Sequence, residues 1–411
     1  RARRTIISAN AISLMAAVVL YIVSVGQVKG FAFALGLATL LDLIVVFLFR
    51  HPVMTMFART RAFLSPRVSG LGRVLKEKPA ATDTVKPRSS RVKEPDMAKE
   101  GLASRLYRGD AGLKIIGRRN MWFAIAAVGV LIALGSFVLR GFTLGIEFTG
   151  GTEFQVPAAN LTIDRASDAV TKAIEESGAE DVKVESTQQV GDDTSGFLLV
   201  KTGEVTADQS IEIKASVAET LDLDPALVSD SRVSGAWGAS VTERAILALL
   251  VFLAVVSLYL VLRFEWRMAV AAVVSLLLDL VLTAGVYSIV GFEVSPSTVI
   301  GFLTILGYAL YDVVVVFDKV QENTKGITAG SGQTYAEASN LAINQTLMRS
   351  INTSLVALLP VGGLLFIGAG VFGARTLEDL GLVLFVGMAL AIYSSLFFAT
   401  PVLVALKDFE P

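Results

Sequence analysis

Long apolar runs are the feature that most constrains this chain. Stretches of about 18 to 25 apolar residues recur along most of its length, and a helix of that size crosses ~30 Å of hydrocarbon. Hydrophobic residues make up 53% of the 411 residues and charged residues only 18%, against ~25% charge in soluble domains. We therefore predict a polytopic α-helical membrane protein with eight spans, near residues 6–24, 31–49, 121–140, 245–262, 268–290, 297–317, 346–368 and 380–405.

Charge placement orients these spans. Residues 50–119 carry 17 Lys and Arg against 6 Asp and Glu, whereas residues 142–240 carry 6 against 18. Because basic loops stay in the cytoplasm, the first segment is expected inside and the second on the outer face of the membrane.

The spans and loops predict five parts. Residues 74–100 are rich in Lys, Pro, Ser, Ala and Glu, which is the composition of a linker. Met97 could start a second polypeptide or be an ordinary linker residue, and the sequence leaves both open. The expected parts are a two-span piece (1–56), a basic cytoplasmic linker (57–119), a single span (120–141), an extracytoplasmic α/β domain (142–240) and a five-helix bundle (241–411).

The outer segment reads as a small α+β domain. Strand-like runs lie near 146–156, 181–189, 195–202 and 226–234, and helical patterns lie near 163–178 and 207–221. The order βαββαβ predicts a ferredoxin-like sandwich. Thr162 and Thr206 are placed to cap the two helices, and Gly178 to end the first.

An internal repeat links the two ends of the chain. Arg4-Thr-Ile-Ile-Ser-Ala-Asn opens the first span pair and Arg349-Ser-Ile-Asn-Thr-Ser-Leu the last, and the two pairs end with Pro52-Val53 and Pro401-Val402. The first pair then belongs to a half whose other spans lie outside this chain, and the second half has one span, an outer domain and five spans. Such a one-plus-five parallel duplication predicts a transporter, with working groups near the interface of the halves.

Charged residues inside predicted spans are the candidate working groups, because a charge in hydrocarbon costs ~2.5–3.5 kcal/mol on insertion scales. Asp312 is the strongest candidate, and Asp279, Asp42 and Arg349 follow. An intramembrane carboxyl can load and release a proton, while an arginine stays charged. An Asp312 whose distance to Arg349 changes would be a proton-coupled switch; the alternatives are a static pair and a snorkelling arginine. Asp279 and Asp42 could serve either a relay or packing against a Ser or Thr.

A second motif lies just outside the third predicted span. It reads Gly145-Ile-Glu-Phe-Thr-Gly-Gly-Thr-Glu153, with glycines that permit close backbone approach and positive φ. It predicts a tight strand–turn–strand, or an ordinary hairpin. Its candidate residues are Gly145, Glu147, Phe148, Thr149, Gly150 and Gly151.

Other chemistries find no support in the residues. The chain has no cysteine and one histidine, His51, which argues against a thiolate or histidine metal site and a Ser-His-Asp triad. No dinucleotide or Walker pattern predicts a nucleotide site. The Tyr311-Asp312 pair lacks the second motif of an intramembrane aspartyl protease. We therefore expect no enzyme activity, cofactor, metal or nucleic-acid partner.

Several motifs together resemble one family. Gly145-Ile-Glu-Phe-Thr-Gly-Gly151 resembles the GIDFTGG motif of the SecF family of protein-export membrane proteins, with Glu147 where Asp is usual. Arg263-Phe-Glu-Trp-Arg267, the segment 307–323 around Asp312 and the segment 344–354 around Arg349 are similar to further motifs of that family. Residues 1–75 resemble the last two spans of SecD. Two departures are Leu278 before Asp279, where the family often has His, and Gly235-Ala-Trp-Gly238, where Gly-Pro is common.

The resemblance implies the fold of the RND superfamily and a bacterial or archaeal cytoplasmic membrane. It implies SecD, the SecYEG channel, the translocating polypeptide and membrane lipid as partners. It also implies an accessory role in which the proton-motive force assists export, with Asp312 and Arg349 as the proton-linked pair. The coupling ion stays open, since a carboxylate serves H⁺ and Na⁺ alike. The alternatives are an RND-type exporter of small molecules or lipids and a passive scaffold of the channel.

Overall fold

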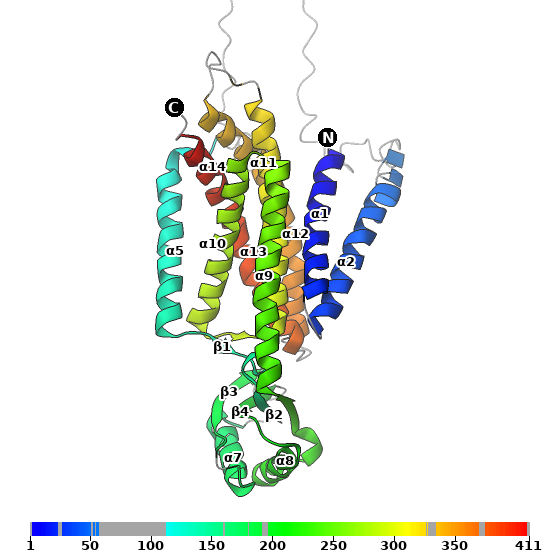
Figure 1. Ribbon diagram of the computed structural model, residues 1–411, viewed down its shortest axis with the longest axis vertical. Coiled ribbons are helices and arrows are strands. Elements are labelled where there is room, and N and C mark those ends of the chain that lie inside the picture. Colours follow the sequence, from blue (N-terminus) through cyan, green and yellow to red (C-terminus); the bar gives the residue numbers. More distant parts are fainter. Residues whose placement is uncertain are drawn as a thin grey trace, which may run out of the picture.

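A computed structural model describes residues 2–23, 27–50, 52–53, 55–56, 112–158, 161–179, 181–190, 196–325, 327, 334–369 and 375–408. It has two parts, a bundle of long helices and a small α/β domain at one end of that bundle (Figure 1). The predicted polytopic helical fold with one α/β domain at the end of the bundle is confirmed.

Each predicted span has a helical counterpart. Seven helical segments in the described residues are long and apolar enough to cross a membrane. The helices are α1 (Ala2–Val23), α2 (Gln27–Val45) with a π-helical end η1 (Val46–Arg50), α5 (Arg119–Leu139), α9 (Gly235–Arg263), α10 (Trp266–Val290), α11 (Pro296–Thr324), α12 (Tyr335–Gly363) with η6 (Leu364–Ala369), and α13 (Arg375–Tyr393) continued by η7 (Ser394–Ala399) and α14 (Thr400–Lys407).

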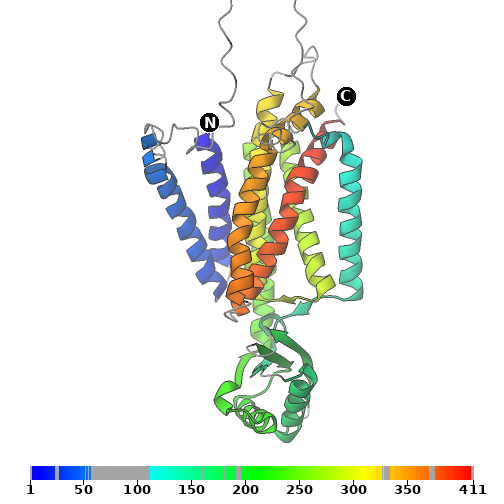
Figure 2. The ribbon, with the colours of Figure 1, turned by 180° about the vertical axis from the view of Figure 1, so that it is seen from behind.

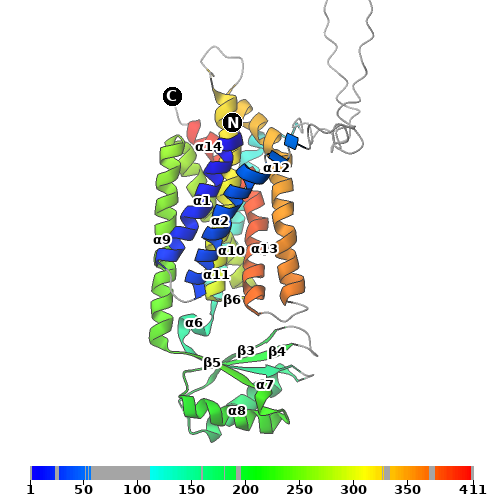
Figure 3. The ribbon, with the colours of Figure 1, turned by 90° about the vertical axis from the view of Figure 1, so that its right-hand side faces the viewer.

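Helix α1 corresponds to the expected span near residues 6–24, which is not among these seven segments. Its apolar stretch, Ser13–Ile22, is shorter than a full crossing, because arginines and polar residues occupy its first turns. It nevertheless runs beside α2 along the bundle and packs against α9 and α11 (Figure 3).

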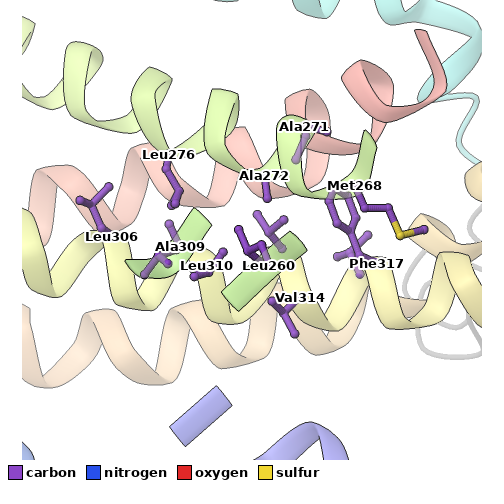
Figure 4. Close-up of a cluster of buried hydrophobic side chains, with 14 of the residues drawn as sticks. Leu260, Met268, Ala271, Ala272, Leu276, Leu306, Ala309, Leu310, Val314 and Phe317 are labelled. Carbon is purple, nitrogen blue, oxygen red and sulfur yellow. The ribbon is translucent and has the colours of Figure 1, made fainter. Parts of the chain in front are cut away.

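The bundle is organised around α11, the most buried of the spanning helices. Leucine, alanine, valine and aromatic side chains of α9, α10 and α11 point toward one another (Figure 4). Ala271, Ala272 and Ala309 are fully buried there, and small side chains allow helix backbones to approach closely in a membrane. Seen from behind, α12 and α13 lie between the α1–α2 pair and α5 (Figure 2).

The connections agree with the expected orientation. One helix, α5, precedes the outer domain and five segments from α9 onward follow it. The end of α2 and the start of α5, which flank the basic segment in the sequence, lie at the end of the bundle opposite the acidic domain (Figure 1). The helix ends that flank the basic segment and the acidic domain therefore lie at opposite ends of the spanning helices.

The outer domain has the predicted βαββαβ order. Its elements are β2 (Gly151–Pro157), α7 (Ile163–Glu176), β3 (Val184–Val190), β4 (Phe197–Thr202), α8 (Ala207–Leu221), η5 (Pro225–Leu227) and β5 (Ser229–Val233). The antiparallel sheet has the strand order β3-β4-β2-β5, which is the ferredoxin-like arrangement. Helices α7 and α8 cover the face turned away from the bundle (Figure 3).

Local signals place the helix ends where the sequence predicted them. Thr162 accepts a hydrogen bond from the backbone N–H of Arg165 at 3.3 Å, and Thr206 forms a capping box with Gln209. Gly178 has φ +71° just after α7. These hydroxyls satisfy N–H groups that have no partner within the helix.

The glycine motif differs from the predicted strand–turn–strand. Residues Ile146–Thr149 form a helical turn, α6, and the strand before it, β1 (Thr143–Leu144), pairs in parallel with β6 (Glu293–Val294). The hairpin expectation is wrong because the partner of β1 lies between α10 and α11, far along the chain. The motif therefore joins the outer domain to the bundle.

Gly150 provides a test of this joint. It has φ +79° and ψ 173°, and a Cβ there would lie 2.6 Å from the Cα of Gly235. Gly150→Ala should lower the free energy of unfolding by about 2–5 kcal/mol, because backbone strain and a backbone clash add. Thermal unfolding in detergent measures this. Gly141→Ala is the matched control, since Gly141 has φ +68° but open space around it, and an equal loss in both variants would contradict the clash.

Asp230 on β5 makes the stability of the outer domain depend on pH. Burial raises the pKa of Asp230, but hydrogen bonds from Lys214 and Ser210 and the charges of Lys214 and Arg232 outweigh burial and hold it below 3.8. A lowered folded-state pKa stabilises the fold above the unfolded pKa of about 4, and that contribution is lost as pH falls through the folded pKa. Melting curves of Asp230→Asn and the parent should therefore differ at pH 6 and converge near pH ~2; a constant difference would contradict the linkage.

Candidate functional site

The intramembrane acid Asp312 lies at the centre of the bundle with two hydroxyl donors. Its side chain belongs to α11 and the residue is 6% exposed. Ser350 on α12 donates to Oδ1 at 2.6 Å, and Ser395 in η7 donates to Oδ2 at 2.6 Å. Three helical segments thus meet at one carboxyl group, and each of its oxygens is satisfied by a different segment.

The segment that provides Ser395 is a π-helical turn. Residues Ser394–Ala399 interrupt the last spanning helix between α13 and α14. Such turns widen the backbone spacing and are frequent at functional sites. Here the turn brings two consecutive buried serines, Ser394 and Ser395, toward the centre of the bundle.

Asp279 is a second buried acid beside the same turn. It lies on α10 and is 1% exposed, with Ser394 next to its carboxylate. Within the described residues neither carboxylate oxygen of Asp279 accepts a hydrogen bond. The hydroxyls of Ser275 and Thr283, one turn away on either side, are also buried without a hydrogen-bond partner there. The two acids of α10 and α11 therefore approach neighbouring serines of η7.

Arg349 lies next to Ser350 on α12, with an exposed side chain. Its positive charge acts on the carboxylate of Asp312, but no ion pair joins the two among the residues that the structure describes. The structure thus brings Arg349 near the site while serines hold Asp312.

Asp42 is placed differently from the other acids. It lies on the exposed side of α2, and no hydrogen bond or ion pair in the described part of the chain joins it to Asp312. The structure does not bring it into the cluster formed by Asp312, Asp279 and the serines of η7.

The outer motif forms a compact joint. The N–H of Gly145 donates to the carbonyl of Val294 at 2.9 Å, and Phe148 is buried. Thr149 donates from Oγ1 to the carbonyl of Gly150 at 3.0 Å. A Cβ on Gly238 of α9 would lie 2.6 Å from the carbonyl oxygen of Phe148. The motif therefore packs tightly against the start of α9. Within it, Gly151 has φ +123° and Glu147 has a buried carboxylate oxygen.

Sequence reasoning missed the serines that hold Asp312. Ser350 lies in the segment 344–354 singled out for Arg349, so its position was available as a signal. Ser395 carries no comparable signal, because a serine in an apolar helix is common and its role depends on the π-helical turn.

Comparisons with known proteins identify the family. The family model for the C-terminal part of the protein export membrane proteins SecD and SecF matches residues 212–408. The family model for the SecD/SecF GG motif matches residues 135–160. The SecF protein translocase subunit of Mycobacterium tuberculosis is 44% identical over 74% of this chain and 69% of its own length. That of Streptomyces coelicolor is 45% identical over 77% of this chain and 82% of its own length.

Solved structures agree in fold. The crystal structure of SecDF, a translocon-associated membrane protein from Thermus thermophilus, matches 99% of this chain with a TM-score of 0.73 and 28% identity. A SecDF structure in a super-membrane-facing form matches with a TM-score of 0.58 and 27% identity. The chain spans 48% of either SecDF chain, about half of its length.

The helical bundle with a buried acid and a ferredoxin-like outer domain defines a multi-pass membrane protein of transporter-like design. The chain belongs to the SecD/SecF family of protein-export membrane proteins, and the family resemblance found in its motifs is confirmed.

The two serine contacts predict a measurable coupling. Ser350→Ala and Ser395→Ala should each lower the free energy of unfolding by about 1–3 kcal/mol, because each leaves a carboxylate oxygen without its donor. Both losses should shrink in an Asp312→Asn background, as a double-mutant cycle would show. Ser257→Ala is the control, since Ser257 donates only to Leu253 of its own helix. Unchanged losses in that background would contradict the contacts.

Proposed function

We propose that this chain is part of the SecDF-type accessory subunit of the Sec export machinery, a role carried by relatives named protein translocase subunit SecF. The proton-motive force would drive its contribution to polypeptide translocation across the cytoplasmic membrane. The observation that carries the proposal is the buried carboxyl of Asp312, held by donors from two other helical segments. The SecYEG channel, a SecD-like half and the emerging polypeptide are the proposed partners.

Protonation of Asp312 changes which hydrogen bonds it can make. The ionised carboxylate accepts from both Ser350 and Ser395, whereas the protonated acid carries an O–H donor of its own. The protonated oxygen is a weaker acceptor, so the serine contact to it is weakened or turns around. The packing of α11 against α12 and η7 therefore depends on the proton, which is the property that a proton-driven device needs.

Arg349 supplies the permanent charge of the switch. It precedes Ser350 by one residue, which is about 100° round an α-helix, so a rotation of α12 about its axis would exchange the serine for the arginine beside Asp312. An ionised Asp312 favours the arginine and a protonated one does not. Asp279, beside Ser394, is the proposed second proton carrier, and Asp42 is assigned to a relay that involves the other half of the subunit.

The remaining domains follow from this role. Helices α1 and α2 are proposed to be the end of the SecD-like half, which the match of the SecDF structure to 99% of the chain supports. The segment 57–119 is proposed as the cytoplasmic linker; residues 57–111 of it lie outside the described residues. The outer domain is proposed to face the emerging chain. Its interior is filled by a hydrophobic core that includes Phe154, Val200 and Ile213, which disfavours an exporter with an internal substrate cavity there.

Asp312→Asn tests the proposal. The variant should assemble normally but lose the proton-motive-force-dependent part of export, because asparagine cannot exchange a proton. Export into membrane vesicles that contain the complete subunit and the channel, measured with and without a proton gradient, gives the answer. Asp318→Asn is the matched control, since Asp318 is on the same helix but pairs with Arg263 at 2.9 Å near its end.

Full gradient-dependent export by Asp312→Asn would refute the proposal. Arg349→Ala separates it from a passive scaffold, which would tolerate the loss of the arginine. Varying pH and sodium separately in the same vesicles identifies the coupling ion.

A further inference from the structure

Buried charge gathers where the outer domain meets the bundle. Two charged residues of the described outer domain are buried, Glu153 on β2 and Lys201 on β4, and they lie opposite each other in the sheet. Glu293 of β6 has a side chain only 8% exposed and meets Lys201, with 2.5 Å between Nζ and Oε1. Charges buried in this way are expensive unless they are paired.

The pair joins two parts of the molecule. Along β4, Leu198 and Val200 point into the core beneath α7 and α8, so Lys201 points to the opposite face of the sheet. That face is turned toward the bundle (Figure 3). Glu293 lies in the connection between α10 and α11, three residues before α11 begins at Pro296. The ion pair therefore ties the sheet of the outer domain to the start of the helix that carries Asp312.

Gly145 makes room for this contact. A Cβ at position 145 would lie 2.8 Å from Oε1 of Glu293 and would also clash with Oε2 of Glu147. Its N–H donates to the carbonyl of Val294, the residue after Glu293. The first glycine of the outer motif thus leaves space beside the carboxylate that meets Lys201.

We propose that the Lys201–Glu293 pair fastens the outer domain to α11, so that the two move as one unit. Lys201 and Glu293 are positioning residues, and they act through α11 on the site at Asp312. The expected effect of this coupled motion on export rests on the proposed function. Loss of either partner removes a charge that stabilises the other at a buried position, so the connection is expected to loosen when one partner is removed.

Spin labels can measure the fastening directly. The chain has no cysteine, so Glu175→Cys on α7 and Leu139→Cys at the outer end of α5 provide two unique, exposed label sites. In the complete subunit, the distance between the labels should form one narrow distribution. Lys201→Met should replace the narrow peak by a broad distribution and remove gradient-dependent export.

Three further variants control for the charge and the fold. Lys201→Arg keeps the charge and should keep the narrow peak and export. Gly145→Ala leaves every charge in place but displaces the Glu293 carboxylate, and should broaden the distribution. Lys214→Met removes a lysine whose ion pair with Asp230, at 2.7 Å, lies within the outer domain, and should leave the peak narrow.

The outcomes separate this inference from the proposed function. A narrow peak in Lys201→Met, or equal broadening in Lys214→Met, overturns the fastening. A broad distribution with full export overturns its coupling to export. If Asp312→Asn retains export while Lys201→Met still broadens the distribution, the proposed function fails and the fastening stands. If Asp312→Asn abolishes export and Lys201→Met leaves the peak narrow, the proposed function stands and the fastening fails.

Discussion

A carboxyl group placed in hydrocarbon must find hydrogen-bond donors, and the bundle is arranged so that Asp312 has them. The donors come from α12 and from the π-helical turn η7, so the cost of burying one acid is offset only when three helical segments pack in one way. A regular helix in place of η7 would present different side chains to α11. Under the proposed function, a change in the protonation of Asp312 would therefore also change the packing of the bundle.

The outer joint obeys a comparable constraint at the membrane surface. Backbones approach so closely at Gly150 and Gly238 that side chains there would collide. The parallel β1–β6 pair and the buried Lys201–Glu293 contact hold the same joint from the side of α11. A close-packed joint transmits displacement better than a flexible linker, because it has no slack in which to absorb it.

Sequence patterns with a short range predicted most of the fold. Apolar runs placed the spans, Thr162 and Thr206 marked helix starts, and alternating β and α patterns identified the outer sandwich. The glycine motif was recognised, but its form was not, because β1 pairs with a strand about 150 residues later in the chain. Pairings of that range leave no periodic trace in the sequence.

The sequence by itself determined that this protein spans a membrane and that burying Asp312 carries an exceptional cost, and it predicted which end lies inside. The cost follows from residue type and from the hydrophobicity of its neighbours, which are local properties. Only the tertiary structure decided that Ser350 and Ser395 meet that acid, that Asp42 does not join it, and that Lys201 reaches Glu293. Those contacts join segments distant in the chain, and their partners are selected by packing.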